Sequence, residues 1–308
     1  QGSRRTDRQD LGDADAAADG ATQAEDRALT ALDPARALGL IYVESGDVVT
    51  GRFSHDRVQQ AAYERLAKDE RDAIHHQLGK GLLAAYHGGD ETQLFDATNH
   101  LNHVPVADLP PSERRPLAEL NLRAARQARA SSAYHVAYAF AQAGLARQPQ
   151  DGFERDYRLT ADLHLEAAES AFLTGDYAAM ERELDTLLRG ARDVFDEVRA
   201  YEIRVVAQNA RNDLVGAMQA CLDALAKLGI VLDVKPTQGA VVSHLLRTKL
   251  ALRGKSVEEL SALPASRGRH EQAASRLLMS LIGPAYYASP NLLPIAAFTV
   301  VRLALDKG

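Results

Sequence analysis

The chain has 308 residues, of which 46% are hydrophobic and only 6% aromatic, with no tryptophan. Alanine and leucine must therefore supply most of the packing, which favours helices packed against helices in one extended array or in two ordinary domains. The 36 basic residues are outnumbered by 42 acidic ones, giving a net charge of −6, and this excludes the basic excess that nucleic-acid binders usually carry.

The single cysteine, Cys221, cannot form an intrachain disulfide or a cysteine-based zinc site, and its apolar helical surroundings predict a buried thiol. No apolar run reaches the roughly 18 residues that a membrane span needs. Residues 1–25 are polar and rich in Asp and Ala, without the apolar core of a signal peptide, and they predict a disordered linker. We therefore expect a soluble, cytoplasmic protein with no nucleic-acid partner.

The next segment predicts a helix and a hairpin. Asp33 as N-cap and Pro34 at the first helical position predict a short helix. Two β-prone runs follow, at 40–43 and 48–53, on either side of a Ser-Gly-Asp turn. This arrangement is typical of a β-hairpin, and it is the one convincing strand signal in the sequence.

Phe53 is expected to point inward from the end of the hairpin. Ser54 predicts the N-cap of a helix over 55–66, and a second helix is expected at 69–86. The helix, hairpin and helix across 26–66 resemble the end of a winged-helix module. From residue 91 onward the pattern predicts helix after helix. The further helices are expected at 91–103, 112–129, 132–147, 154–173, 176–189, 193–210, 213–228, 237–252, 267–287 and 291–306.

Three copies of one turn recur in this array, beginning at Ser132, Gly175 and Asn212, which are 43 and then 37 positions apart. In each copy a large apolar residue follows two positions after the turn residue. Three positions further on stands a residue where the paired helices must approach closely: Ala137, Met180 or Ala217. The spacing is longer and less regular than the roughly 34 residues of a standard tetratricopeptide repeat. We therefore predict an all-α, tetratricopeptide-like helical-hairpin solenoid over 67–308, truncated at its C-terminus because the last residues show no capping repeat.

No catalytic motif is complete. Gly254-Lys255-Ser256 ends like a phosphate loop, but a lysine within a predicted helix stands where the first glycine is required. His55-Asp56-Arg57 has the letters of a kinase catalytic loop in the wrong order. His100 and His103 lie three apart near Asp96 and could touch one ion, but there is no HExxH arrangement. We expect no catalytic, cofactor-binding or metal-binding residue in this segment.

The run Arg-Phe-Ser-His-Asp-Arg-Val-Gln-Gln-Ala-Ala-Tyr at 52–63 carries a resemblance. It is similar to the junction in large bacterial signalling proteins that join a Ser/Thr kinase domain, a STAND/AAA-type ATPase module, a helical-repeat region, a GAF domain and a histidine kinase. In that family a phenylalanine, a His-Asp pair and Val-Gln-Gln-Ala-Ala-Tyr follow the winged-helix part of the ATPase. Weaker matches continue through the helical array and are clearest before residue 180, as in 94–102 and 163–169.

The resemblance implies a segment that relays a signal between a nucleotide-driven switch and an output kinase, without catalysis of its own. The parent protein would be an ATP-dependent protein kinase, and the segment's partners would be other domains of that chain, a protein, or a small-molecule effector. We expect the interdomain contact at His55, Asp56, Arg57, Gln59 and Gln60. The helical-repeat segment of a STAND-type transcription regulator remains the main alternative, and a helical enzyme with an unrecognised site is a third.

Overall fold

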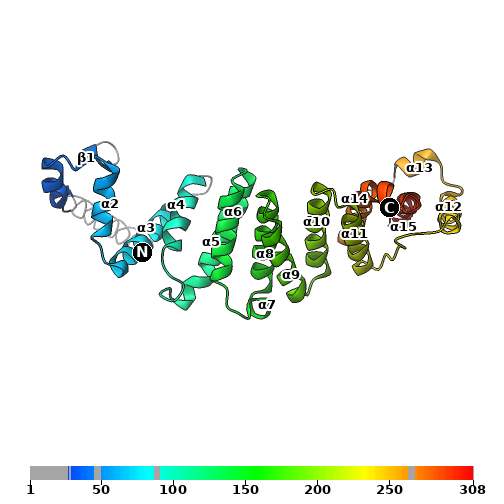
Figure 1. The fold of residues 1–308 in the computed structure, drawn as a ribbon, viewed down its shortest axis with the longest axis horizontal. Helices are drawn as coiled ribbons and strands as arrows, with labels where there is room; N and C mark the ends of the chain where they lie inside the picture. The colour runs from blue at the N-terminus through cyan, green and yellow to red at the C-terminus, as the bar shows by residue number, and fades with distance from the viewer. Residues whose placement is uncertain (1–26, 28, 45–49, 87–90, 263–267, 308) are drawn as a thin grey trace, which may run out of the picture. The chain divides into compact units, whose positions relative to one another are not determined.

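The computed structural model describes residues 27, 29–44, 50–86, 91–262 and 268–307. The predicted linker at 1–25 and the predicted turn at 45–47 lie outside these described residues. Within them, the chain is an all-α helical solenoid with one small antiparallel hairpin, as the sequence predicts (Figure 1). It divides into two compact units, Gln1–Ile74 and His75–Gly308, so that the boundary falls inside α3 (Lys68–Ala85).

In the N-terminal unit, residues 29–37 are helical and the predicted hairpin follows them. β1 (Ile41–Glu44) pairs antiparallel with β2 (Thr50–Phe53), and α2 (Asp56–Glu64) then contacts β2. The prediction that Asp33 caps the first helix is wrong, because the helix already includes residues 29–32. The Asp33 carboxylate instead pairs with Nη1 of Arg36, one turn along the same helix, at 3.1 Å.

The start of α2 corrects two further predictions. His55, and not Ser54, is the N-cap, because its Nδ1 accepts a hydrogen bond from the Arg57 amide at 3.3 Å. The Ser54 hydroxyl instead donates to the carbonyl oxygen of Leu40 at 3.0 Å, which ties the end of the hairpin to its beginning. The sequence pattern predicts an inward-pointing Phe53, but 42% of this residue is exposed. The unit is too thin to enclose it.

The second unit holds helices throughout its described residues. Ten of them fall within three residues of the predicted bounds, and two short ones, α7 and α13, were not predicted. In chain order they are α4 (Glu91–Asn102), α5 (Pro111–Ala130), α6 (Tyr134–Ala146), α7 (Gly152–Arg155), α8 (Tyr157–Leu173), α9 (Tyr177–Gly190), α10 (Val194–Ala210), α11 (Leu214–Lys227), α12 (Gln238–Leu252), α13 (Val257–Ser261), α14 (Arg269–Ala288) and α15 (Leu292–Lys307).

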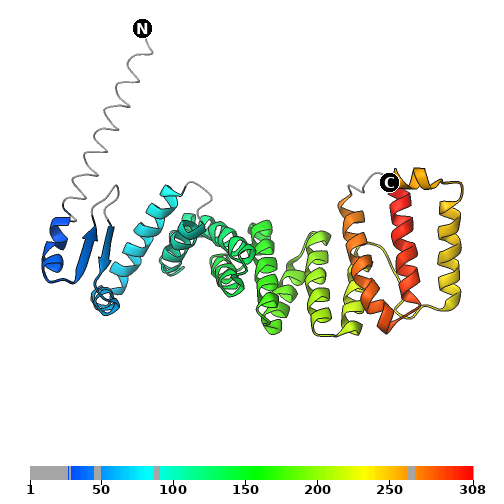
Figure 2. The ribbon, with the colours of Figure 1, turned by 90° about the horizontal axis from the view of Figure 1, so that it is seen from above.

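Helices that are neighbours in sequence are neighbours in space over most of this unit. From α5 to α11, each long helix packs against the next, and α10 contacts both α8 and α9. The order changes at the C-terminal end, where α14 rather than α12 packs on α11, and α12 lies against α15. Figure 2 shows α14, α15 and α12 side by side in that order. Alanine and leucine dominate the buried residues, as the composition predicts.

The three recurring turns share one backbone conformation. Ser132, Gly175 and Asn212 have φ of 63°, 81° and 58°, all in the left-handed region. After each of them, the next amide donates to the carbonyl five positions back at 2.8 or 2.9 Å, which is the Schellman arrangement for ending a helix. Asp176 and Asp213 then cap the following helix through their side chains. The repeat that the sequence predicts is therefore a repeat of turn geometry.

The second helix of each pair packs as the repeat pattern predicts, since Ala137, Met180 and Ala217 are all almost completely buried. Polar bonds also join successive pairs at a regular spacing. Nε of Arg129 donates to Glu166, 37 positions later, at 2.6 Å, and the Tyr157 hydroxyl donates to Asp196, 39 positions later, at 2.9 Å. Each hairpin is thus held to its neighbour by apolar packing and by buried or half-buried polar contacts.

Candidate interaction surface

The five residues predicted to form an interdomain contact lie together on or beside α2. His55, Asp56, Arg57, Gln59 and Gln60 are all exposed, and α2 contains no buried residue. With 3.6 residues per turn, His55, Asp56, Gln59 and Gln60 fall on one side of the helix, and Arg57 lies outside that face. The structure therefore brings four of the five together as a polar face.

Few contacts within the unit engage this polar face. The Gln60 amide donates to the Glu64 carboxylate at 2.8 Å along the helix, and His55 serves as the N-cap. Val58, next to this face, is half-buried. The face therefore presents imidazole, carboxylate and amide groups that can hydrogen-bond to another protein surface.

The N-terminal unit also exposes large apolar side chains. Leu38 is 74% exposed, Tyr42 52% and Phe53 42%, and no residue of this unit that the structure describes is classed as buried. A two-stranded hairpin with two or three short helices and no core is marginal in water. Tyr42 pairs with Arg52 and Phe53 pairs with Ile41, so each face of the hairpin exposes an aromatic side chain. Exposed apolar surface of this kind often marks a region that another protein covers.

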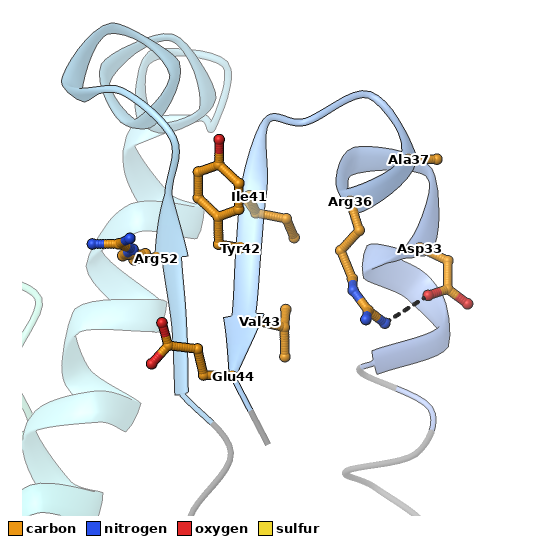
Figure 3. Close-up of a pocket in the computed structure, with 8 residues that line it drawn as sticks. All are labelled: Asp33, Arg36, Ala37, Ile41, Tyr42, Val43, Glu44 and Arg52. Atoms are coloured by element: carbon orange, nitrogen blue, oxygen red, sulfur yellow. Dashed lines mark hydrogen bonds and ion pairs between the residues drawn. The ribbon is translucent and has the colours of Figure 1, made fainter. Parts of the chain in front are cut away.

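Beside the hairpin lies an open hollow of about 680 Å³, lined by Asp33, Arg36, Ala37, Ile41, Tyr42, Val43, Glu44 and Arg52. Figure 3 shows Ile41 and Val43 directed from β1 toward the first helix, while Tyr42 and Glu44 point to the other side of the strand. The Arg52 guanidinium lies 5.6 Å from the centre of the Tyr42 ring. The hollow mixes apolar and charged groups, which suits a protein contact better than an enclosed small-molecule site.

Histidines gather near the start of the solenoid. The Nδ1 atoms of His75 and His100 lie 2.8 Å apart, and the His75 ring stacks on that of His103 with centroids 4.0 Å apart. His76 instead contacts Glu113 at 2.6 Å, so the adjacent His75 and His76 side chains point in different directions. The hydrogen bond from His76 holds the pKa of Glu113 below its ordinary value. Among the described residues no group of three or more His, Cys, Asp or Glu side chains could hold a metal ion.

A basic hollow in the solenoid was missed by sequence analysis. It has a volume of about 460 Å³ and lies between the start of α5, the end of α6 and α7. Four arginines line it: Arg114, Arg115, Arg147 and Arg155. They come from three elements, so no local run of basic residues reveals them. The only hint in the sequence was Arg147, which follows the apolar residues at the end of α6. An arginine at such a position is ordinarily solvated.

Two other sequence features are settled by the structure. Cys221 is buried in the core formed by α11 and α14, as predicted, and burial raises the pKa of its thiol to about 12. None of the described helices has both the length and the apolarity that crossing a bilayer would require.

The fold and the surface define the chain as a helical-hairpin solenoid with an N-terminal unit that exposes several large apolar side chains. The chain is similar to the hybrid signal transduction histidine kinase G of Dictyostelium discoideum, with 23% identity over 245 residues that cover 71% of the chain. The chain spans about 7% of the length of that protein. No family model matches the chain, and no solved structure matches it significantly. The similarity supports the coarser part of the resemblance, namely a role in signalling.

Proposed function

We propose that the chain is a non-catalytic relay segment of a larger signalling protein. In this proposal the N-terminal unit docks on a neighbouring domain, and the solenoid binds a protein or a small effector. Catalysis belongs to other domains of the parent protein, an ATP-dependent kinase. The similarity to a short stretch of a much longer histidine kinase supports this reading.

The observation that carries the proposal is the absence of a buried residue among the described residues of the N-terminal unit, together with its exposed Leu38, Tyr42 and Phe53. Burying such side chains gives about 25 cal/mol per Å² of apolar surface, so covering them stabilises the unit substantially. We therefore expect this unit to be fully ordered only when a second domain covers it. The winged-helix part of an ATPase module is the partner that the resemblance at 52–63 suggests.

The solenoid has the properties of a relay. Its helix pairs contact their neighbours through clusters of buried apolar residues and through repeated polar bonds, such as that between Arg129 and Glu166. In an array of this kind, a change at one pair is felt first by the adjacent pairs. Ligand binding at one hairpin can therefore alter the stability of the hairpins beside it.

The test is made in the full-length signalling protein. A double substitution, His55→Ala with Asp56→Ala, removes the imidazole and carboxylate of the polar face. We expect effector-dependent kinase output to fall about tenfold or more, as for loss of hydrogen-bonded charged groups at an interface. A matched control is Gln219→Ala with Asp223→Ala, which removes an exposed hydrogen-bonded pair from α11. Unchanged output from the first double variant, with both proteins equally folded, would overturn the proposed docking role.

A further inference from the structure

The basic hollow of the solenoid contains a buried cation that no described residue neutralises. Arg147 is 6% exposed. Its Nη1 donates to the carbonyl oxygen of Ala143 at 2.7 Å, and its Nη2 to that of Asn102 at 3.3 Å. Its Nε is buried and has no hydrogen-bond partner. The two carbonyls hold the guanidinium in place, but they do not neutralise its charge. Burial accordingly lowers the pKa of Arg147.

The second unusual arginine is Arg114, one turn into α5. Its Nε is also buried without a partner. It lines the same hollow as Arg147, although the two residues are 33 positions apart in sequence and come from different helices. Two partly unsatisfied guanidinium groups at one hollow are costly, because a buried charge is tolerated only where it is paired.

The remaining charged groups around the hollow do not supply the missing counter-charge. Arg115 is held by Asp156 at 2.6 Å and by Glu119 at 2.9 Å. Arg155 is held by Asp151 at 2.6 Å. The three carboxylates are therefore engaged with the two outer arginines, and Arg114 and Arg147 are left over. Four guanidinium groups and one carboxylate, that of Asp156, line the hollow, so it carries a net positive charge.

The walls and the size suit a small molecule. Val106, Pro111 and Pro149 add apolar and rigid surface, and Gln148 adds an amide. The volume of about 460 Å³ lies within the ~300–1,000 Å³ of typical small-molecule sites. A guanidinium presents its N–H groups as a planar fork that matches the oxygens of a phosphate or a carboxylate.

We infer that this hollow binds a small molecule bearing a phosphate or carboxylate group, with Arg147 and Arg114 donating to its oxygens. This inference gives the chemical class of the effector in the proposed relay. It rests on the proposed function only for its biological meaning. Binding itself is a property of this chain. It can therefore be measured without kinase output, and either idea can fail alone.

The test is calorimetric titration and thermal shift of the whole 308-residue chain with inorganic pyrophosphate and with citrate, at constant ionic strength. Pyrophosphate binding alone assigns the site to phosphate groups, and citrate binding alone assigns it to carboxylates. We expect Arg147→Gln and Arg114→Gln each to weaken binding about tenfold or more, as for loss of charge-assisted hydrogen bonds. Arg189→Gln, an exposed arginine of α9 outside the hollow, is the matched control and should bind normally.

Two results would overturn the inference. One is that neither anion raises the melting midpoint beyond what sodium chloride of equal ionic strength does. The other is that all three variants bind the anion as well as the unchanged chain does, which would place any binding elsewhere. Two variants at the hollow guard against misfolding. The Arg114 side chain forms no hydrogen bond or ion pair with another described residue, so it can be replaced even if Arg147 cannot.

Discussion

Gly175 offers a sharp test of the turn that repeats through the solenoid. Its φ is 81°, and no atom lies within 4 Å of the Cβ that an alanine would add. The cost of Gly175→Ala is therefore conformational and not steric. An L-residue in the left-handed region costs roughly 1–2 kcal/mol, and about 0.4–1 kcal/mol is offset because alanine also restricts the unfolded chain. We expect a net loss of about 1 kcal/mol.

The assay must be local, because repeat arrays often do not unfold in one two-state step. The amide of Asp176 donates to the Ala171 carbonyl at 2.9 Å, and the amide of Ala179 donates to the Asp176 carboxylate at 2.9 Å. Hydrogen exchange at these two amides reports the opening of the turn. A loss of about 1 kcal/mol should speed their exchange roughly fivefold.

The same substitution at Gly81 is the control. Gly81 lies exposed within α3, without the positive φ of Gly175 and with no atom near the added Cβ. Alanine there should stabilise the helix by about 0.5–1 kcal/mol, because glycine is the poorer helix former. The two substitutions are therefore expected to have opposite signs. If Gly175→Ala left exchange unchanged or slowed it, the backbone explanation of the repeat would be wrong.

Three further outcomes are expected. Burial raises the pKa of Glu183, but hydrogen bonds from His164 and Gln142 outweigh it and hold the pKa below 4.5. Stability present at neutral pH is then lost as pH falls through that lowered pKa, so Glu183→Gln should flatten the acid limb of unfolding between about pH 5 and 3. The Cys221 thiol should not react with a thiol reagent until the chain unfolds, since burial raises its pKa to about 12; rapid native labelling would contradict this. Asp196→Ala should lower the free energy of unfolding by denaturant by about 2–3 kcal/mol, because Asp196 is 2% exposed and accepts hydrogen bonds from a tyrosine and an arginine. The exposed Asp185→Ala is the control and should cost under about 1 kcal/mol. Equal losses from the two substitutions would refute the burial argument.

Most helices of the solenoid could be predicted from the sequence because the signals that define a helix are local. Apolar spacing and caps lie within a few residues of each other, so the helix predicted at 237–252 is observed at 238–252, with Thr237 as its N-cap. The turn residues 132, 175 and 212 were recognised from their spacing, and all three have positive φ. Spacing does not show that Ser132 and Asn212, which are not glycine, adopt the same backbone as Gly175.

Features that depend on contacts with residues distant in sequence were not predicted correctly. Ser54 and His55 are both able to cap a helix, and the choice was made by the Leu40 carbonyl, which takes the Ser54 hydroxyl. Phe53 was placed inside a core that the unit does not have. The arginines of the basic hollow come together only when α5, α6 and α7 pack, so their chemistry is invisible along the chain. The interdomain role of the α2 polar face remains a prediction.

The regular spacing of the bonds between hairpins has a consequence for folding during synthesis. Between α5 and α10, bonds such as Arg129 to Glu166 and Tyr157 to Asp196 join residues only 37 and 39 positions apart. Contacts of such short range form quickly, because little loop closure precedes them. Each hairpin can therefore pack on its predecessor as soon as about 40 more residues have left the ribosome, and domains do generally fold during synthesis. During synthesis, this part of the chain therefore exposes the apolar surface of only one incomplete hairpin at a time.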